Sequence, residues 1–440
     1  ILIFGIAILI SVPLGKYIAN VFAGSKTPLD FLQPAEKLIY RFCGIDPATE
    51  MDCKQNLKAL LTVNLVWLLY AMIMLMTQGA LFLNPDGNPS QSPDLAFNTS
   101  ISFMVNCDLQ HYSGESGATY LTQIAVITFL MFVSAATGIA AAAIFFRALR
   151  DRVTDKLGNF WVYFVRSITR ILLPICIIIA ALLAFNGVPP SFEGKDAIVT
   201  VEGDTINVRR GPAAGMIAIK HLGTNGGGWF GANSSHPFEN PNYFTNAVEM
   251  IGQWIIPLAM IFAMGFFINR RKLAHVIFAV MTIGFLALVI PTVIQEVQGS
   301  PAIARLGVPQ PGGAMEGKEV RLGAAASGFW SIVTTVISTG SVNSMHDSTM
   351  PLSGMMQMLA MMINAFYGGC GVGLLNYFIY IIVAVFISGL MVGRTPEFLG
   401  HKVEAREIKI AALITLLSPF LILTGTALAA YFNAHHPEAA

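Results

Sequence analysis

Residues 212–228 of the chain read PAAGMIAIKHLGTNGGG. An apolar segment, residues 212–222, is followed at once by a polar turn, residues 223–228, in which four of the six residues are glycine. The apolar segment is too short to cross a bilayer, because a hydrocarbon core of about 30 Å needs about 20 residues of helix. A short helix followed by an irregular turn is typical of a re-entrant half-helix, whose turn lines a cavity or is buried in protein.

The same order of a short apolar segment and a polar turn occurs three times along the chain. The other two examples are residues 95–104 followed by 105–108, and residues 325–337 followed by 338–343. Asn106, Gly226 and Gly340 occupy similar places in the three turns and lie 120 and 114 residues apart. This regular spacing predicts an architecture of repeated units. A fourth turn would fall beyond residue 440, and the chain begins inside an apolar run, so we expect a fragment.

Composition places these units in a membrane. Of the 440 residues, 55% are hydrophobic and 12% are charged, with a net charge of +1. These values exclude a soluble globular enzyme, a disordered chain and a polybasic nucleic-acid binder. About eight membrane spans are predicted, at residues 1–12 (the tail of a span), 59–83, 118–146, 165–185, 251–268, 274–294, 374–393 and 410–432.

Lysine and arginine are distributed unevenly between the loops. Seventeen lie in residues 13–58, 147–159, 269–273 and 394–409, and seven lie in the alternate loops. The positive-inside rule therefore puts the first set in the cytoplasm and the three polar turns on the outer side. Arg166 and Arg170 lie within the span at residues 165–185, and we expect their side chains to snorkel to the membrane interface. The alternative is a functional contact with lipid head groups or a partner subunit.

The polar turns fit a cation. A half-helix that enters from outside points its partly negative C-terminal end at the membrane centre. Glycine-rich turns can aim successive carbonyl groups at one axis and replace the hydration shell of an ion, as potassium filters do. Residues 95–108, 222–234 and 337–346 contain one carboxylate, Asp108, and no lysine or arginine.

Six longer stretches carry a resemblance to a known family. They are NCDLQHYSGE (106–115), HLGTNGGGWFGANSSHPFENP (221–241), MEGKEVRLG (315–323), GSVNSMHDS (340–348), GGCGVGL (368–374) and GLMVGRTPEFLG (389–400). Together they resemble the channel-like, potassium-binding subunit family of the Kdp-type potassium-transporting ATPases. The likeness follows nearly the whole chain in order.

The resemblance implies an all-α, multi-pass membrane protein with helix, re-entrant pore loop and helix repeats of the potassium-channel superfamily. We expect three complete repeats and the start of a fourth. The implied segments are an N-terminal span and cytoplasmic segment (1–58), pore repeats at 59–146, 160–268 and 274–393, and the first helix of a fourth repeat (410–440).

The family also implies the ion-binding residues. They are Val105, Asn106, Cys107 and Asp108 in the first turn, Thr224, Asn225, Gly226 and Gly227 in the second, and Ser338, Thr339, Gly340 and Ser341 in the third. Gly368, Gly369, Cys370 and Gly371 resemble an intramembrane loop that gates passage below the filter. Four small residues in succession are expected to interrupt a helix there, and the alternative is a simple kink between two packed helices. The first turn departs from the family's usual Thr-Asn-Thr-Asn, because it loses two hydroxyl groups and gains the carboxylate of Asp108. That carboxylate either raises local cation affinity or lies at the outer mouth.

The implied function is potassium binding from outside and transfer to a P-type ATPase subunit in an uptake complex of a bacterial or archaeal cell membrane. A single-span accessory subunit, a small accessory peptide and membrane lipid are the other implied partners, and no nucleic acid is expected. Potassium is the expected ligand, and the chain contains no Walker motif or phosphorylation loop that would bind ATP. The alternatives are a stand-alone Trk/Ktr-like channel or secondary uptake protein, and a membrane enzyme that uses His236 or His346.

Two smaller elements are also predicted outside the spans. Residues 34–42 have the pattern of a short amphipathic helix on the cytoplasmic surface. Residues 193–210 alternate apolar and polar side chains around Gly203 and Asp204, which indicates an external β-hairpin. His346 with Asp347, and residues 234–237, are interpreted as loop braces.

Overall fold

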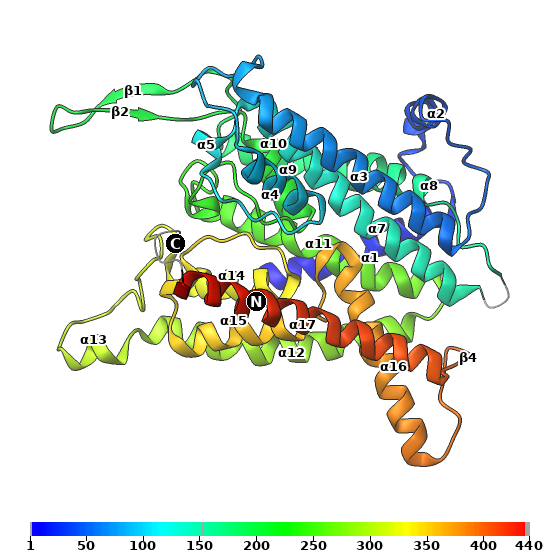
Figure 1. Cartoon of the computed structure of the whole chain (residues 1–440). Helices are drawn as coiled ribbons and strands as arrows, with labels where there is room; N and C mark the ends of the chain where they lie inside the picture. The colour runs from blue at the N-terminus through cyan, green and yellow to red at the C-terminus, as the bar shows by residue number, and fades with distance from the viewer. Residues whose placement is uncertain (1, 152–153, 436–440) are drawn as a thin grey trace. The chain divides into compact units, whose positions relative to one another are not determined.

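The computed structural model describes residues 2–151 and 154–435 (Figure 1). The chain divides into two compact units, residues 1–374 and 375–440, and each is described by itself. Residue 1 and residues 436–440, at the outer ends of the predicted first and last segments, lie outside the described residues, as do residues 152–153 of a predicted cytoplasmic loop.

Within the described ranges, eight helical runs are long and apolar enough to cross a membrane, as predicted. They are α1 (Leu2–Ala23), α3 (Cys53–Thr77) with η2 (Gln78–Ala80), α6 (Tyr120–Thr122) with η3 (Gln123–Thr128) and α7 (Phe129–Arg150), α8 (Phe160–Arg166) with η4 (Ser167–Leu172) and α9 (Leu173–Phe185), α11 (Tyr243–Phe267), α12 (Arg271–Gln298), α16 (Val372–Val392) and α17 (Ala405–His435). Several begin before their apolar cores because caps fix their ends. At the start of α3, the Asp52 carboxylate accepts the Gln55 N–H at 2.8 Å.

Three short helices precede the polar turns, as predicted. They are α4 (Pro93–Met104), α10 (Ala214–Leu222) and α14 (Gly323–Ile337). Each is followed by a non-glycine residue in the left-handed region, with φ of 61° at Asn106, 52° at Thr224 and 57° at Ser338. This conformation reverses the chain sharply after the helix, so the three half-helices end in the same way.

The core of the first unit is built around α11, most of whose residues are buried. It packs against α1, α10 and α12. The approach of α1 is close because Gly15 faces α11, and a Cβ atom there would lie 2.7 Å from the Ala259 carbonyl oxygen. On the same helix, the Trp254 ring lies 5.0 Å from Phe4 and 5.2 Å from Tyr367, measured between centroids.

On the predicted cytoplasmic side, η1 (Asp30–Leu32) leads into α2 (Gln33–Phe42), which confirms the predicted short helix. The expectation that Arg170 snorkels to the interface is wrong. Its side chain is 3% exposed, and its guanidinium binds the Glu36 carboxylate at 2.6 Å and Asp30 at 2.5 Å. A buried guanidinium needs such partners, and here they come from a segment more than 130 residues earlier in the chain.

The predicted β-hairpin is also confirmed. Strands β1 (Asp196–Val199) and β2 (Thr205–Val208) pair antiparallel, with Asp196 opposite Val208 and Val199 opposite Thr205. Figure 1 shows this hairpin projecting from the rest of the first unit. The remaining short elements of that unit are α5 (Gly114–Gly117), η5 (Asn233–Ser235), α13 (Pro301–Arg305), η6 (His346–Ser348), α15 (Pro351–Ile363) and η7 (Gly369–Gly371).

The chain is interrupted between α15 and α16, where the small residues 368–371 were predicted to break a helix. Asn364 and Cys370 both have positive φ, of 41° and 52°, and η7 separates the two helices. In the second unit, the rest of α16 is followed by the two-residue strands β3 (Glu397–Phe398) and β4 (His401–Lys402) and then by α17.

Candidate ion-binding site

The backbone defines which positions of the three turns are equivalent. In each turn one N–H returns to the carbonyl group five residues earlier. The donors are Cys107 to Ser102 at 2.9 Å, Asn225 to Lys220 at 2.7 Å, and Thr339 to Thr334 at 2.9 Å. The left-handed residue precedes the donor each time, so Asn106, Thr224 and Ser338 are structurally equivalent.

By this register the first turn starts at Asn106, one residue later than the predicted set, which started at Val105. Val105 is the C-terminal cap of α4, with φ of −95° and ψ of 10°, and Gly223 caps α10 with φ of −84° and ψ of 2°. Val105 is 64% exposed, whereas Thr224 and Asn225 of the second turn are fully buried. The equivalent residues of the first turn are therefore Asn106, Cys107 and Asp108, followed by Leu109.

Side chains of the first turn bind the backbone of the second. Asn106 donates from Nδ2 to the Thr224 carbonyl at 3.0 Å, while its Oδ1 accepts from Ser134 of α7 at 2.7 Å. Four residues after Asn106, the side-chain oxygen of Gln110 accepts the Gly228 N–H at 2.8 Å. These bonds pair the buried polar groups of two segments more than 100 residues apart in sequence.

Asp108 belongs to the same set of contacts. The residue is 3% exposed, and its Oδ2 accepts the Gly226 N–H at 2.9 Å. Its other oxygen, Oδ1, has no hydrogen-bond partner in the part of the chain that the structure describes. Asp108 is therefore enclosed against the second turn, with one acceptor atom left over.

The second and third turns touch through their backbones. A Cβ atom added at Gly226 would lie 2.8 Å from the Thr339 carbonyl oxygen and 3.1 Å from the Gly340 Cα. His221, the residue before the last of α10, joins the same pair of turns, because its Nε2 lies 2.9 Å from the Ser341 hydroxyl. The Trp330 indole of α14 donates to the Ser341 carbonyl at 2.8 Å. Glycine at residue 226 is thus required by the close approach of the two backbones.

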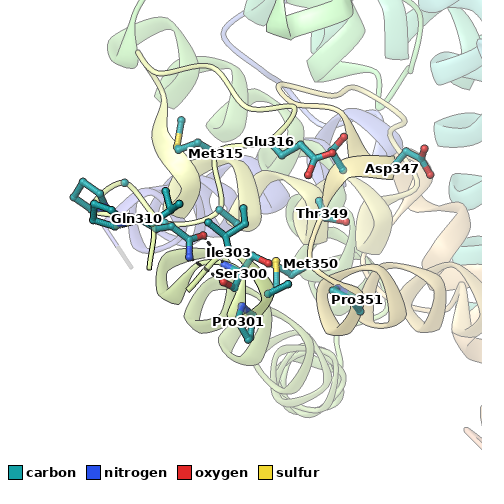
Figure 2. A pocket seen from close by; sticks show the side chains of 18 residues that line it. Ser300, Pro301, Ile303, Gln310, Met315, Glu316, Asp347, Thr349, Met350 and Pro351 are labelled. Atoms are coloured by element: carbon teal, nitrogen blue, oxygen red, sulfur yellow. Dashed lines mark hydrogen bonds between the residues drawn. The ribbon is translucent and has the colours of Figure 1, made fainter. Parts of the chain in front are cut away.

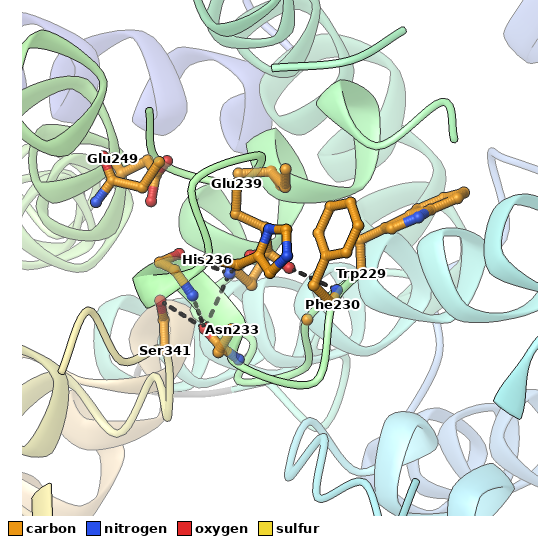
Figure 3. Close-up of polar contacts among 12 residues, drawn as sticks. Trp229, Phe230, Asn233, His236, Glu239, Glu249 and Ser341 are labelled. Carbon is orange, nitrogen blue, oxygen red and sulfur yellow. Dashed lines mark hydrogen bonds and ion pairs between the residues drawn. The ribbon is translucent and has the colours of Figure 1, made fainter. Parts of the chain in front are cut away.

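Sequence reasoning missed a buried polar cluster behind these two turns, drawn in Figure 3. Lys220 was counted among the external loop cations, but its side chain is fully buried and forms an ion pair with Glu239, which is also fully buried. Asn233 lies between this pair and the turns. Glu249 of α11 lies 3.3 Å from the His221 ring. The available signal was a lysine inside an otherwise apolar half-helix, which needs a buried partner.

The predicted gate loop lies directly against the second turn. Cys370 is 1% exposed, and its thiol lies 3.5 Å from the Thr224 hydroxyl and 3.8 Å from the Leu222 carbonyl oxygen. Neighbouring glycines allow this approach, since a Cβ atom on Gly368 would lie 2.6 Å from the Ile337 carbonyl oxygen at the end of α14. The loop therefore contacts the ends of two half-helices.

The two predicted loop braces behave differently. Ser234 accepts a hydrogen bond from Lys220 at 2.8 Å, so it braces the end of α10 just before the second turn. The side chains of His346 and Asp347 instead lie in different surroundings. The Nε2 atom of His346 is buried, whereas Asp347 is exposed and lines an outer pocket of about 770 Å³ with Glu316 and the α13 loop (Figure 2).

Comparison with known proteins agrees with this architecture. The profile of the family described as potassium-transporting ATPase A subunit matches residues 1–439. A Flavobacterium johnsoniae protein named potassium-transporting ATPase potassium-binding subunit is 65% identical over 98% of this chain and 76% of its own length. Proteins of the same name are 58% identical in Phocaeicola vulgatus, with the same coverage, and 49% identical in Alicyclobacillus acidocaldarius, over 95% of this chain and 74% of that relative. The chain belongs to the potassium-transporting ATPase A subunit family.

Proposed function

We propose that this chain is the potassium-binding and translocating subunit of an ATP-driven, high-affinity potassium uptake complex in a bacterial cell membrane. The observation that carries the proposal is the set of three half-helices whose polar turns are held together by hydrogen bonds between turns. Such turns present backbone carbonyls and partly negative helix ends to a dehydrated cation. The names of the bacterial relatives support a pump subunit over a stand-alone channel.

The residues that we assign to the ion path follow the backbone register. They are Asn106, Cys107 and Asp108, then Thr224, Asn225, Gly226 and Gly227, and then Ser338, Thr339, Gly340 and Ser341. Val105 is kept only as the helix cap that precedes them. Residues 368–371 act as the gate below the second turn, and the repeats at 59–146, 160–268 and 274–393, with the start of a fourth at 410–440, supply the pore helices.

Hydrolysis of ATP takes place in another subunit under this proposal. The sequence offers no nucleotide-binding motif, and the relatives are named as binding subunits. A P-type ATPase subunit, a single-span subunit and a small peptide are the proposed partners. Potassium is then the transported ion, bound from outside.

The test is the ATPase activity of the complex purified with its partner subunits. We expect activity to rise with potassium but not with sodium, and to be absent when the ATPase subunit is omitted. Activity of the full complex that ignores potassium between micromolar and millimolar concentrations would overturn the proposal.

A further inference from the structure

The Asn233 side chain, in the cluster behind the filter, contacts both the second and the third turn (Figure 3). Its Nδ2 donates to the Gly226 carbonyl at 2.8 Å, and its Oδ1 accepts the Val342 N–H at 3.2 Å. The residue has a left-handed backbone, with φ of 55°. One amide group therefore spans two segments that are separated by more than 100 residues of chain.

The orientation of this amide is fixed by charge. The Lys220 ammonium has three donors and no acceptor, and it points them at Asn233 Oδ1 at 3.0 Å, at the Ser234 hydroxyl at 2.8 Å and at the Glu239 carboxylate. The amide atom that faces an ammonium must be the oxygen. The amide nitrogen consequently faces the Gly226 carbonyl and donates to it.

The charge that fixes the amide is itself neutralised. Lys220 and Glu239 are both fully buried, and the second carboxylate oxygen of Glu239 accepts the Phe230 N–H at 2.9 Å. A buried ion pair of this kind is costly to separate, because removing one partner leaves an unpaired charge. The pair can therefore hold the amide without adding net charge beside the ion path.

We propose that Asn233, oriented by the Lys220–Glu239 pair, is a positioning residue that fixes the Gly226 carbonyl and the spacing of the second and third turns, and thereby sets the potassium affinity of the filter. A carbonyl oxygen has two lone pairs, so the bond from Asn233 leaves one for a potassium ion. Neither Asn233 nor Lys220 contacts the ion in this arrangement. The inference rests on the proposed function and adds residues outside the turns that control it.

The decisive variant is Asn233→Asp in the purified complex with its partner subunits. Aspartate keeps the size of the side chain but cannot donate to the Gly226 carbonyl. Asn233→Gly is the second variant, because glycine adopts the left-handed backbone without strain and removes the whole side chain. Asn269→Asp is the matched control, since Asn269 is also left-handed, with φ of 56°, but is exposed between α11 and α12.

For both Asn233 variants we expect the potassium concentration for half-maximal ATPase activity to rise about tenfold, with the maximal rate within about twofold of wild type. Sodium or rubidium should also stimulate more strongly relative to potassium. Asn269→Asp should leave both parameters unchanged.

Half-saturating potassium within twofold of wild type in Asn233→Asp and Asn233→Gly would overturn the inference. A lower maximal rate or poorer assembly at unchanged potassium affinity would do the same, because that pattern marks a purely structural role. If Asn233→Asp fails to assemble, the Asn233→Gly measurement decides. If the ATPase activity of the wild-type complex did not depend on potassium, the proposed function would be overturned instead, so the two failures are distinguishable.

Discussion

Replacing Gly226 by alanine tests the backbone contact between the second and third turns. The added Cβ would lie 2.8 Å from the Thr339 carbonyl oxygen and 3.1 Å from the Gly340 Cα. Both neighbours are backbone atoms, so neither can rotate away as a flexible side chain would. The two turns must therefore separate by a few tenths of an ångström for the methyl group to fit.

The expected cost follows from overpacking. Inserting a methyl group into a closely packed site costs about 1–3 kcal/mol when the surroundings cannot rearrange. If the strain is relieved by separating the turns, the lost energy appears as weaker ion binding. At about 1.4 kcal/mol for each factor of ten, the potassium concentration for half-maximal ATPase activity should rise by about 5-fold to 150-fold.

The assay is potassium-stimulated ATPase activity of the assembled complex, together with its thermal unfolding in detergent. Gly215→Ala is the matched control, because Gly215 lies in α10, the half-helix that precedes the second turn, and a Cβ atom there would meet nothing within 4 Å. We expect the control to bind potassium as wild type does. Wild-type potassium affinity in Gly226→Ala would refute the view that the two turns are held in contact.

Three further predictions concern charged groups. Glu36→Gln should destabilise the chain by about 3 kcal/mol in thermal unfolding, because it removes the main partner of the buried Arg170 guanidinium; an unchanged melting temperature would contradict this. Burial, with a smaller effect of Lys318, lowers the pKa of His346 to about 4. Its neutral form is therefore favoured by folding, and stability should be full above about pH 6.5 and fall by about 2 kcal/mol at pH 5. His346→Asn should remove that part of the pH dependence. If the stability of the variant fell between pH 6.5 and pH 5 as steeply as that of the wild type, His346 would not be its cause. Asp108→Asn keeps an acceptor for the Gly226 N–H but loses a charge, so half-saturating potassium should rise about fivefold or more; an unchanged value would show that the carboxylate has no influence on the ion.

The membrane architecture was predictable from the sequence because hydropathy reports directly on burial in lipid. Spans, half-helices, the surface helix and the hairpin all follow from segment length and side-chain period, and the structure has each of them. The register of the first turn was not predictable in this way. It depends on where α4 stops, and the cap at Val105 with left-handed Asn106 leaves no glycine in the sequence to mark the place.

The pairing of buried charges that lie far apart in the sequence was the other feature that the sequence did not predict. Arg170 was expected to reach the membrane interface, and Lys220 was counted as a loop cation, because their spacing alone gives no partner. Arg170 finds Glu36, which lies 134 positions earlier, and Lys220 finds Glu239 across the polar turn. A pattern of residues shows that a buried cation needs a counter-charge. Only the folded chain shows which carboxylate supplies it.

The hydrogen bonds that join the first turn to the second, and the second to the third, are made by different parts of the chain. This difference bears on the composition of the first turn. The join between the first and second turns uses a side chain of the first turn, Asn106, and that of Gln110, two residues after the turn, which bind the backbone of the second. The join between the second and third turns uses side chains outside the turns, in particular Asn233.

A substitution in the first turn therefore changes the ion path and the join together. The resemblance described above implies that asparagine is usual at residue 108, and the Oδ2 atom of Asp108 accepts the Gly226 N–H as an asparagine oxygen would. The carboxylate thus preserves the join while it alters the electrostatics of the path. Because each side of Gly226 is bound by a different neighbour, by Asp108 at its N–H and by Asn233 at its carbonyl, changing one contact at a time can separate charge from geometry at a single residue.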